Sequence, residues 1–209
     1  LGILATVWVI RYFLGGSIEK GSSRILFAIA RKGGSLPRKQ MYAQIWTSAL
    51  TVGMGGSAGL ESPITITGAA IGSNFAKKYH LTQKERLLLL ACGVAAGIGA
   101  AFNAPIAGVL FAIEVVLVDV ATSAFVPIII AAATGSLISQ VVLNEGILLH
   151  FPNQQPFYYQ NTLYYIALGI ICGYIAVYHA RWFHKVEQKI SRITERGFRR
   201  ALIGGLLLG

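Results

Sequence analysis

The chain has 209 residues, of which 55% are hydrophobic and 12% are charged, and its mean hydropathy is +0.62. Soluble domains carry roughly 25% charged residues, so this composition excludes an ordinary soluble protein and indicates an integral membrane protein. The net charge of +10 is concentrated at the edges of apolar runs, which is typical of cytoplasmic loops under the positive-inside rule. We therefore expect a multi-pass protein surrounded by membrane lipid, with no nucleic-acid partner.

The first quarter of the chain predicts three helical segments, of which the one over residues 24–30 is far too short to cross a membrane. Residues 1–14 have an apolar helical pattern, and the glycine-containing segment 15–21 interrupts it. A short helix is predicted over residues 24–30 and another over residues 42–52. The second of these leads directly into a glycine-rich loop.

That loop, residues 55–63, carries one carboxylate, Glu61. Ser62 is a good N-cap and Pro63 suits the first helical position, so a helix is predicted to begin here and to end at the lysines of residues 77–78. About 16 residues, roughly 24 Å, separate Glu61 from the lysines, less than a hydrocarbon core of ~30 Å. Glu61 is thus expected inside the bilayer, where a charge needs a partner. The free N–H groups of the helix would stabilise its carboxylate or a bound anion.

A second interrupted helix follows. Thr82 is a candidate N-cap with Glu85 three residues later, which is the pattern of a capping box. The predicted helix runs from residue 83 to residue 101 and breaks over residues 102–105, and Pro105 opens a further helix to residue 118. Broken helices at membrane depth are typical of transporters, because irregular backbone is tolerated there only around a protein-lined or water-filled cavity.

The last third of the chain predicts two spans. Residues 126–143 form one, and the loop of residues 144–160 contains neither Lys nor Arg, which places it outside the cytoplasm. Residues 162–183 span back and continue into a basic helix over residues 181–200. The pattern is that of a multi-pass protein of a bacterial inner membrane.

Small residues recur in the apolar segments. Two pairs have the small-xxx-small spacing that allows helices to pack closely, Gly68 with Gly72 and Gly93 with Gly97. The two cysteines, Cys92 and Cys172, lie in apolar helices without the spacing of metal ligands, so they are interpreted as packing residues. We expect no metal and no cofactor.

Two motifs resemble the CLC family of chloride channels and chloride/proton antiporters. Residues 59–63, Gly-Leu-Glu-Ser-Pro, resemble the family's GxEGP motif, and residues 95–114 resemble its AAFNAPLAGxLFxxE stretch almost residue for residue. The resemblance covers residues 1–209 as one fragment, the first half of the transport domain. It implies an all-α membrane fold, a bundle of tilted and broken helices forming one half of an inverted repeat. It also implies a homodimer in which each subunit has its own anion pore.

The resemblance gives Glu61 the role of the gating glutamate, which occupies an anion site and swings away when protonated or displaced. The backbone around Leu60, Ser62 and Ile64 would supply N–H groups to chloride or a similar anion. The alternative from the residues alone is that Glu61 only caps its helix.

Three positions depart from the family pattern. Ser62 stands where the family usually has glycine. The family's GSGIP loop falls on residues 19–23, where Gly21 is retained and Lys20 replaces the serine, so anion preference is open. Lys20 either lines the anion path or extends to the cytoplasmic surface. The usual Glu-Glu pair reads Glu114-Val115, so Glu114 is either a structural helix-end residue or a substitute for the inner proton relay.

The predicted function is anion permeation without enzymatic turnover, either passive or coupled to protons. The sequence does not decide between channel and antiporter. The alternative function is a non-conducting membrane scaffold or a divergent regulatory relative of the family, to which the altered loop around Lys20 points. An intramembrane hydrolase is a poorer interpretation, because no set of nucleophile, base and orienting residue can be assembled.

Overall fold

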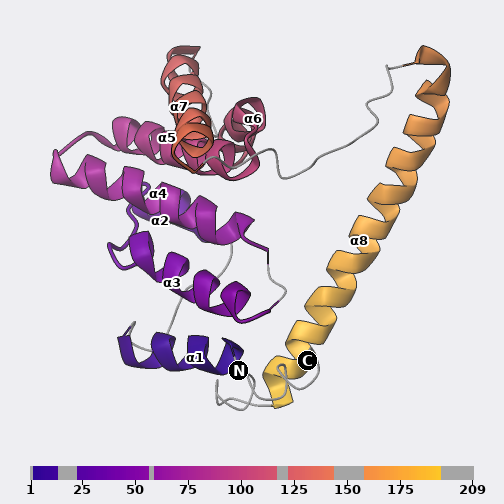
Figure 1. The fold of residues 1–209 in the computed structure, drawn as a ribbon, viewed down its shortest axis with the longest axis horizontal. Helices are drawn as coiled ribbons and strands as arrows, with labels where there is room; N and C mark the ends of the chain where they lie inside the picture. Colours follow the sequence, from indigo (N-terminus) through magenta and orange to yellow (C-terminus); the bar gives the residue numbers. More distant parts are fainter. Residues whose placement is uncertain (1, 14–22, 57–58, 117–121, 144–157, 194–209) are drawn as a thin grey trace. The chain divides into compact units, whose positions relative to one another are not determined.

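The computed structural model describes residues 2–13, 23–56, 59–116, 122–143 and 158–193 (Figure 1). All regular structure in these ranges is helical, which confirms the predicted all-α class. The chain divides into two compact units, residues 1–149 and residues 150–209, and each is described by itself.

The first unit contains seven α-helices within its described ranges. They are α1 (Gly2–Phe13), α2 (Ser23–Lys32), α3 (Gln40–Gly53), α4 (Glu61–Lys78), α5 (Gln83–Phe102), α6 (Pro105–Val116) and α7 (Phe125–Leu143), with a 3-10 turn η1 (Thr122–Ala124) before α7. The second unit contains a 3-10 turn η2 (Tyr159–Asn161) and the single long helix α8 (Thr162–Ile193). The predicted span and the start of the basic segment after it are therefore one continuous helix.

Helix α5 lies at the centre of the first unit. It packs against α4, α6 and α7, while α4 lies between α3 and α5, and α1 packs on α3 (Figure 1). Leu90, Ala91, Val94 and Ala95 of α5 are fully buried, and they meet apolar side chains from the surrounding helices. These side chains are removed from contact with water or lipid, and together they form one continuous apolar core in the unit.

The start of α5 is the predicted capping box. The N–H of Glu85 donates to Thr82 Oγ1 at 3.4 Å, and the N–H of Thr82 donates to Glu85 Oε2 at 2.8 Å. Two N–H groups at the helix start are satisfied in this way, so the prediction from Thr82 and Glu85 is confirmed.

Glycines bring the backbones of α4 and α5 into direct contact, as the small-xxx-small spacing predicts. A Cβ at Gly68 would overlap the carbonyl oxygen of Gly93, and a Cβ at Gly72 would overlap that of Leu89. The two helices would have to separate to admit any larger side chain. This contact fixes the position of α4 on α5.

The break between α5 and α6 falls where the sequence predicts it. Asn103 ends α5 in the left-handed conformation, with φ 50° and ψ 38°, and Pro105 opens α6. The Oδ1 of Asn103 accepts hydrogen bonds from Ser136 Oγ, at 2.6 Å, and from Gln140 Nε2, both on α7. Helix α7 therefore holds the break in place.

Among the residues that the structure describes, three segments are long and apolar enough to cross a membrane, namely Gln83–Phe102, Phe125–Val142 and Tyr159–Val186. Helix α6 is apolar but shorter, and α4 is not among the three. Helix α4 has 18 residues, so its absence reflects its composition rather than its length, and the expectation that Glu61 lies at membrane depth stays a prediction. Helix α5 is long enough to cross the membrane over its full length. The position of its C-terminal break within the membrane therefore stays a prediction.

Candidate functional site

Helix α4 begins two residues earlier than the sequence predicts. Its N-cap is Leu60, with φ −90° and ψ −10°, and no side chain caps it. The expectation that Ser62 is the N-cap is therefore wrong, because Glu61, Ser62 and Pro63 all belong to the first turn. The N–H groups of a first turn have no acceptor within the helix, so proline fits there without losing a hydrogen bond.

Backbone N–H groups are left without acceptors at this helix start. The N–H of Ile64 donates to the carbonyl of Leu60 at 3.1 Å, so it is not one of the free donors that the sequence analysis assumed. Within the described part of the chain, the N–H groups of Leu60, Glu61 and Ser62 have no hydrogen-bond acceptor. These unpaired donors lie at the positive end of the helix dipole, where an anion is stabilised.

The carboxylate of Glu61 lies at the same helix end. The residue is exposed, and its backbone carbonyl accepts from Thr65 Oγ1 at 2.6 Å. Among the described residues no hydrogen bond or ion pair holds the carboxylate itself. A carboxylate without a fixed partner can change rotamer, which is what a group that alternately occupies and vacates an anion site requires.

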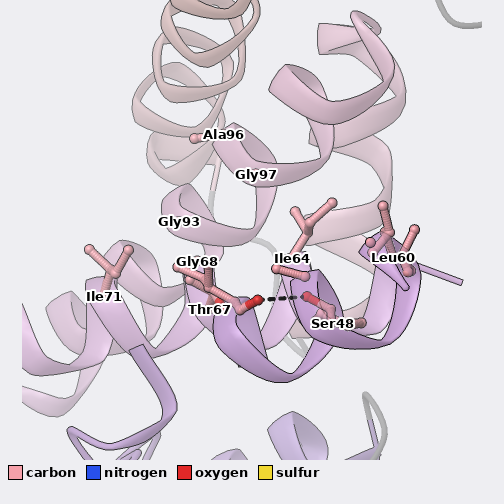
Figure 2. Close-up of a pocket in the computed structure, with 14 residues that line it drawn as sticks. Ser48, Leu60, Ile64, Thr67, Gly68, Ile71, Gly93, Ala96 and Gly97 are labelled. Atoms are coloured by element: carbon pink, nitrogen blue, oxygen red, sulfur yellow. Dashed lines mark hydrogen bonds between the residues drawn. The ribbon is translucent and has the colours of Figure 1, made fainter. Parts of the chain in front are cut away.

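A groove of about 640 Å³ opens beside this helix start, between α3, α4 and α5. Figure 2 shows Leu60 and Ile64 of α4 at one side and Gly93, Ala96 and Gly97 of α5 at the other. The lining is almost entirely apolar and does not include Glu61. Ser48 and Thr67 contribute the hydroxyl groups of this lining, and Ser48 Oγ donates to the carbonyl of Gln44, so the unpaired N–H groups at the start of α4 are the candidate anion site.

The remaining predicted site residues are Lys20, Gly21 and Glu114. Lys20 and Gly21 lie outside the described residues, so their roles stay predictions. Glu114 is exposed near the end of α6, while Val115 is half-buried against the core and Val116 is buried. No hydrogen bond between Glu114 and Glu61 is present in the described ranges.

A buried polar cluster at the other end of α4 was not predicted from the sequence. Ser73 Oγ accepts from the N–H of Leu36 at 3.0 Å and donates to the carbonyl of Gly34 at 2.6 Å, and Asn74 Nδ2 donates to the carbonyl of Leu36 at 3.3 Å. The signal was two adjacent polar residues in an otherwise apolar stretch of the helix. These bonds fix the loop that joins α2 to α3 against the last turns of α4.

Lys77 lies at this basic end of α4, beyond the apolar part of the helix. Its Nζ donates to the carbonyl of Leu36 at 2.8 Å. Burial lowers the pKa of Lys77, and the positive charges of Arg86, Arg38 and Lys32 lower it further. Four cations therefore share one small region.

Comparison with known proteins identifies the chain. A profile of the family described as voltage gated chloride channel matches residues 2–209. The chain belongs to this family. Membership confirms the resemblance carried by residues 59–63 and 95–114, and with the apolar helices it makes the chain an integral membrane protein.

The related proteins are longer than this chain. A ClcB-like protein of Ralstonia nicotianae is 28% identical over 212 residues, which cover all of this chain and 49% of that protein. The chloride channel protein CLC-f of Arabidopsis thaliana is 32% identical over 146 residues, 66% of this chain and 19% of that protein. The crystal structure of a slow cyanobacterial Cl⁻/H⁺ antiporter matches the fold with a TM-score of 0.79 at 22% identity, covering 98% of this chain and 49% of the antiporter. The chain thus spans about half the length, or less, of the proteins it matches.

Proposed function

We propose that the protein containing this chain moves chloride or a similar small anion across the membrane, and that the N-terminus of α4 is one of its anion sites. The observation that carries the proposal is the coincidence, at one helix start, of three unpaired N–H groups and a carboxylate with no fixed partner. An anion and the Glu61 carboxylate have the same charge and need the same donors. They would therefore compete for the site, with Glu61 as the gating group.

Membership in the family supports this assignment for the whole protein. The Arabidopsis relative is named as a chloride channel, and the matched crystal structure is that of a Cl⁻/H⁺ antiporter. Competition between the Glu61 carboxylate and an anion is compatible with a channel and with an antiporter, because protonation of a carboxylate removes the charge that excludes the anion. A homodimer in a bacterial inner membrane, with Glu114 as a further proton-transfer residue in the antiporter mode, is part of the same proposal.

The test is flux from liposomes that contain the full-length protein, with chloride efflux and proton movement recorded together. Protons driven against their gradient by chloride establish an antiporter, and chloride efflux without them establishes a channel. Liposomes that lose neither ion faster than protein-free liposomes would contradict the proposal and favour a non-conducting scaffold.

A further inference from the structure

Four cations from different elements meet at the basic end of α4. Lys77 of α4 donates to the carbonyl of Leu36, and Arg86 of α5 donates through a terminal guanidinium nitrogen to the carbonyl of Gly33 at 3.5 Å. Lys32 and Arg38 flank the same short loop in sequence, and the charges of all three neighbours act on Lys77. We refer to Lys32, Arg38, Lys77 and Arg86 as the basic cluster.

The frame that holds the basic cluster is rigid. Ser73 is fully buried, and both the N–H of Leu36 and the carbonyl of Gly34 are bonded to its hydroxyl. Gly33 and Gly34 turn the chain with φ 55° and φ 76°, which side-chain-bearing residues rarely adopt. The loop therefore has a fixed path across α4, and Lys77 and Arg86, which donate to its carbonyls, are positioned before any ligand arrives.

The positive charge of the basic cluster is not compensated by the carboxylate next to Arg86 in the sequence. Glu85, adjacent to Arg86, accepts from the N–H of Thr82 at 2.8 Å and from its hydroxyl at 2.7 Å, so it is used in the capping box. The Nε of Arg86 is buried and has no hydrogen-bond partner in the part of the chain that the structure describes. The hydrogen bond of this guanidinium is to a backbone carbonyl, so no carboxylate offsets its charge within the described residues.

The surroundings of the basic cluster are those of a membrane surface. It lies where the apolar segment Gln83–Phe102 begins. At the same end of α4 the exposed rings of Phe75 and Tyr79 lie 4.6 Å apart, and Lys78 Nζ is 5.8 Å from the centre of the Tyr79 ring. Aromatic rings next to lysines are typical of the headgroup level, and the positive-inside rule assigns this side to the cytoplasm.

We propose that the basic cluster binds the phosphate group of an anionic phospholipid of the cytoplasmic leaflet. A guanidinium group matches the geometry of a phosphate with two parallel hydrogen bonds, and the ammonium groups of Lys77 and Lys32 add positive charge. Basic pockets between membrane helices on the cytoplasmic side bind such headgroups. The site is separate from the anion site at the other end of α4, so it does not depend on the proposed transport function.

The test is a binding titration of the full-length protein in phosphatidylcholine nanodiscs, read by native mass spectrometry and by thermal unfolding. The probes are phosphatidylglycerol, additional phosphatidylcholine and inorganic phosphate. We expect phosphatidylglycerol to bind and to raise the unfolding temperature, and the other two probes to do neither. The double variant Lys32→Gln/Arg38→Gln should bind phosphatidylglycerol roughly tenfold more weakly, because it removes two of the four charges that would contact the phosphate.

The matched control is Arg31→Gln/Lys39→Gln, which removes the same charge from exposed neighbouring positions. It should change the affinity less than about twofold. Lys32 and Arg38 are exposed, so their replacement does not disturb the core, whereas Arg86→Gln also alters a partly buried contact and is the secondary variant. Equal weakening in both double variants, absence of a preference for phosphatidylglycerol, or equally tight binding of inorganic phosphate would each overturn the proposal.

Discussion

At its first turn α4 leaves the N–H groups of Leu60, Glu61 and Ser62 without acceptors among the described residues, whereas at its last turns Ser73 and Lys77 are bonded to a loop from another part of the chain. The N-terminal end of α4 thus has no side-chain cap, and we call it the untied end. The C-terminal end is hydrogen-bonded to the loop between α2 and α3, and we call it the tied end. Unsatisfied donors persist at an exposed helix end because solvent or a ligand completes them, while buried polar groups need partners within the protein. The comparison separates the end available for binding anions from the end that holds the helix in place.

Replacing the carboxylate at the untied end should have the largest effect. In Glu61→Gln the side chain no longer titrates, so pH-dependent gating or proton coupling of chloride flux should be lost completely. The measurement is chloride and proton flux from liposomes over a range of external pH.

Glu114→Gln is the companion variant, since it removes another exposed carboxylate. If Glu114 is a structural helix-end residue, proton-coupled flux is unchanged, and if it is the inner relay, coupling is lost while chloride still moves. An unaltered pH dependence of chloride flux in Glu61→Gln would show that Glu61 at the untied end does not control gating.

A change in the middle of α4 should destabilise both ends together. The added methyl group of Gly68→Ala overlaps the backbone of Gly93, so α4 and α5 must separate. Overpacking of this kind costs about 1–3 kcal/mol or more of the free energy of unfolding. Denaturant titration of the purified protein in detergent measures the loss, and Gly53→Ala, where a Cβ meets nothing within 4 Å, is the control.

At the tied end, Ser73→Ala should lower the free energy of unfolding by about 1–3 kcal/mol, because the N–H of Leu36 and the carbonyl of Gly34 both lose their partner in a buried place. Chloride flux per folded protein should remain. The same denaturant titration tests the prediction, and a stability equal to that of wild type would show that the loop is held in another way.

At the untied end, Ser62→Ala should have the smallest effect. Ser62 does not cap the helix, so the free energy of unfolding should change by less than about 0.5 kcal/mol. A loss of about 1 kcal/mol, as expected for removal of a true N-cap, would restore the helix start predicted from the sequence.

Features with local signals were predictable from the sequence. Thr82 and Glu85 are three residues apart, and their capping box follows from that spacing alone. The break at Asn103 and Pro105 is equally local, because it depends on one residue that tolerates a left-handed conformation and one that cannot continue a helix.

The start of α4 and the contacts between distant parts of the chain were not predictable from the sequence. Proline fits any position of a first turn, so Ser62 and Pro63 do not decide whether α4 begins at residue 61 or 63. The bonds of Ser73 to Gly34 and Leu36 join residues 37 to 39 positions apart, and no local pattern shows which loop will pass over the helix. For the same reason the sequence showed the cations of residues 31–39 and 77–86 as separate groups rather than as one cluster.

The most direct test of the central claim is chloride binding to the full-length protein, measured by isothermal titration calorimetry for wild type and Glu61→Gln over a range of pH. If the carboxylate and the anion compete for the N-terminus of α4, the variant binds chloride more tightly than wild type at neutral pH. The wild-type affinity then approaches that of the variant as the pH falls. Equal affinities at every pH would contradict the claim that Glu61 and chloride share this site.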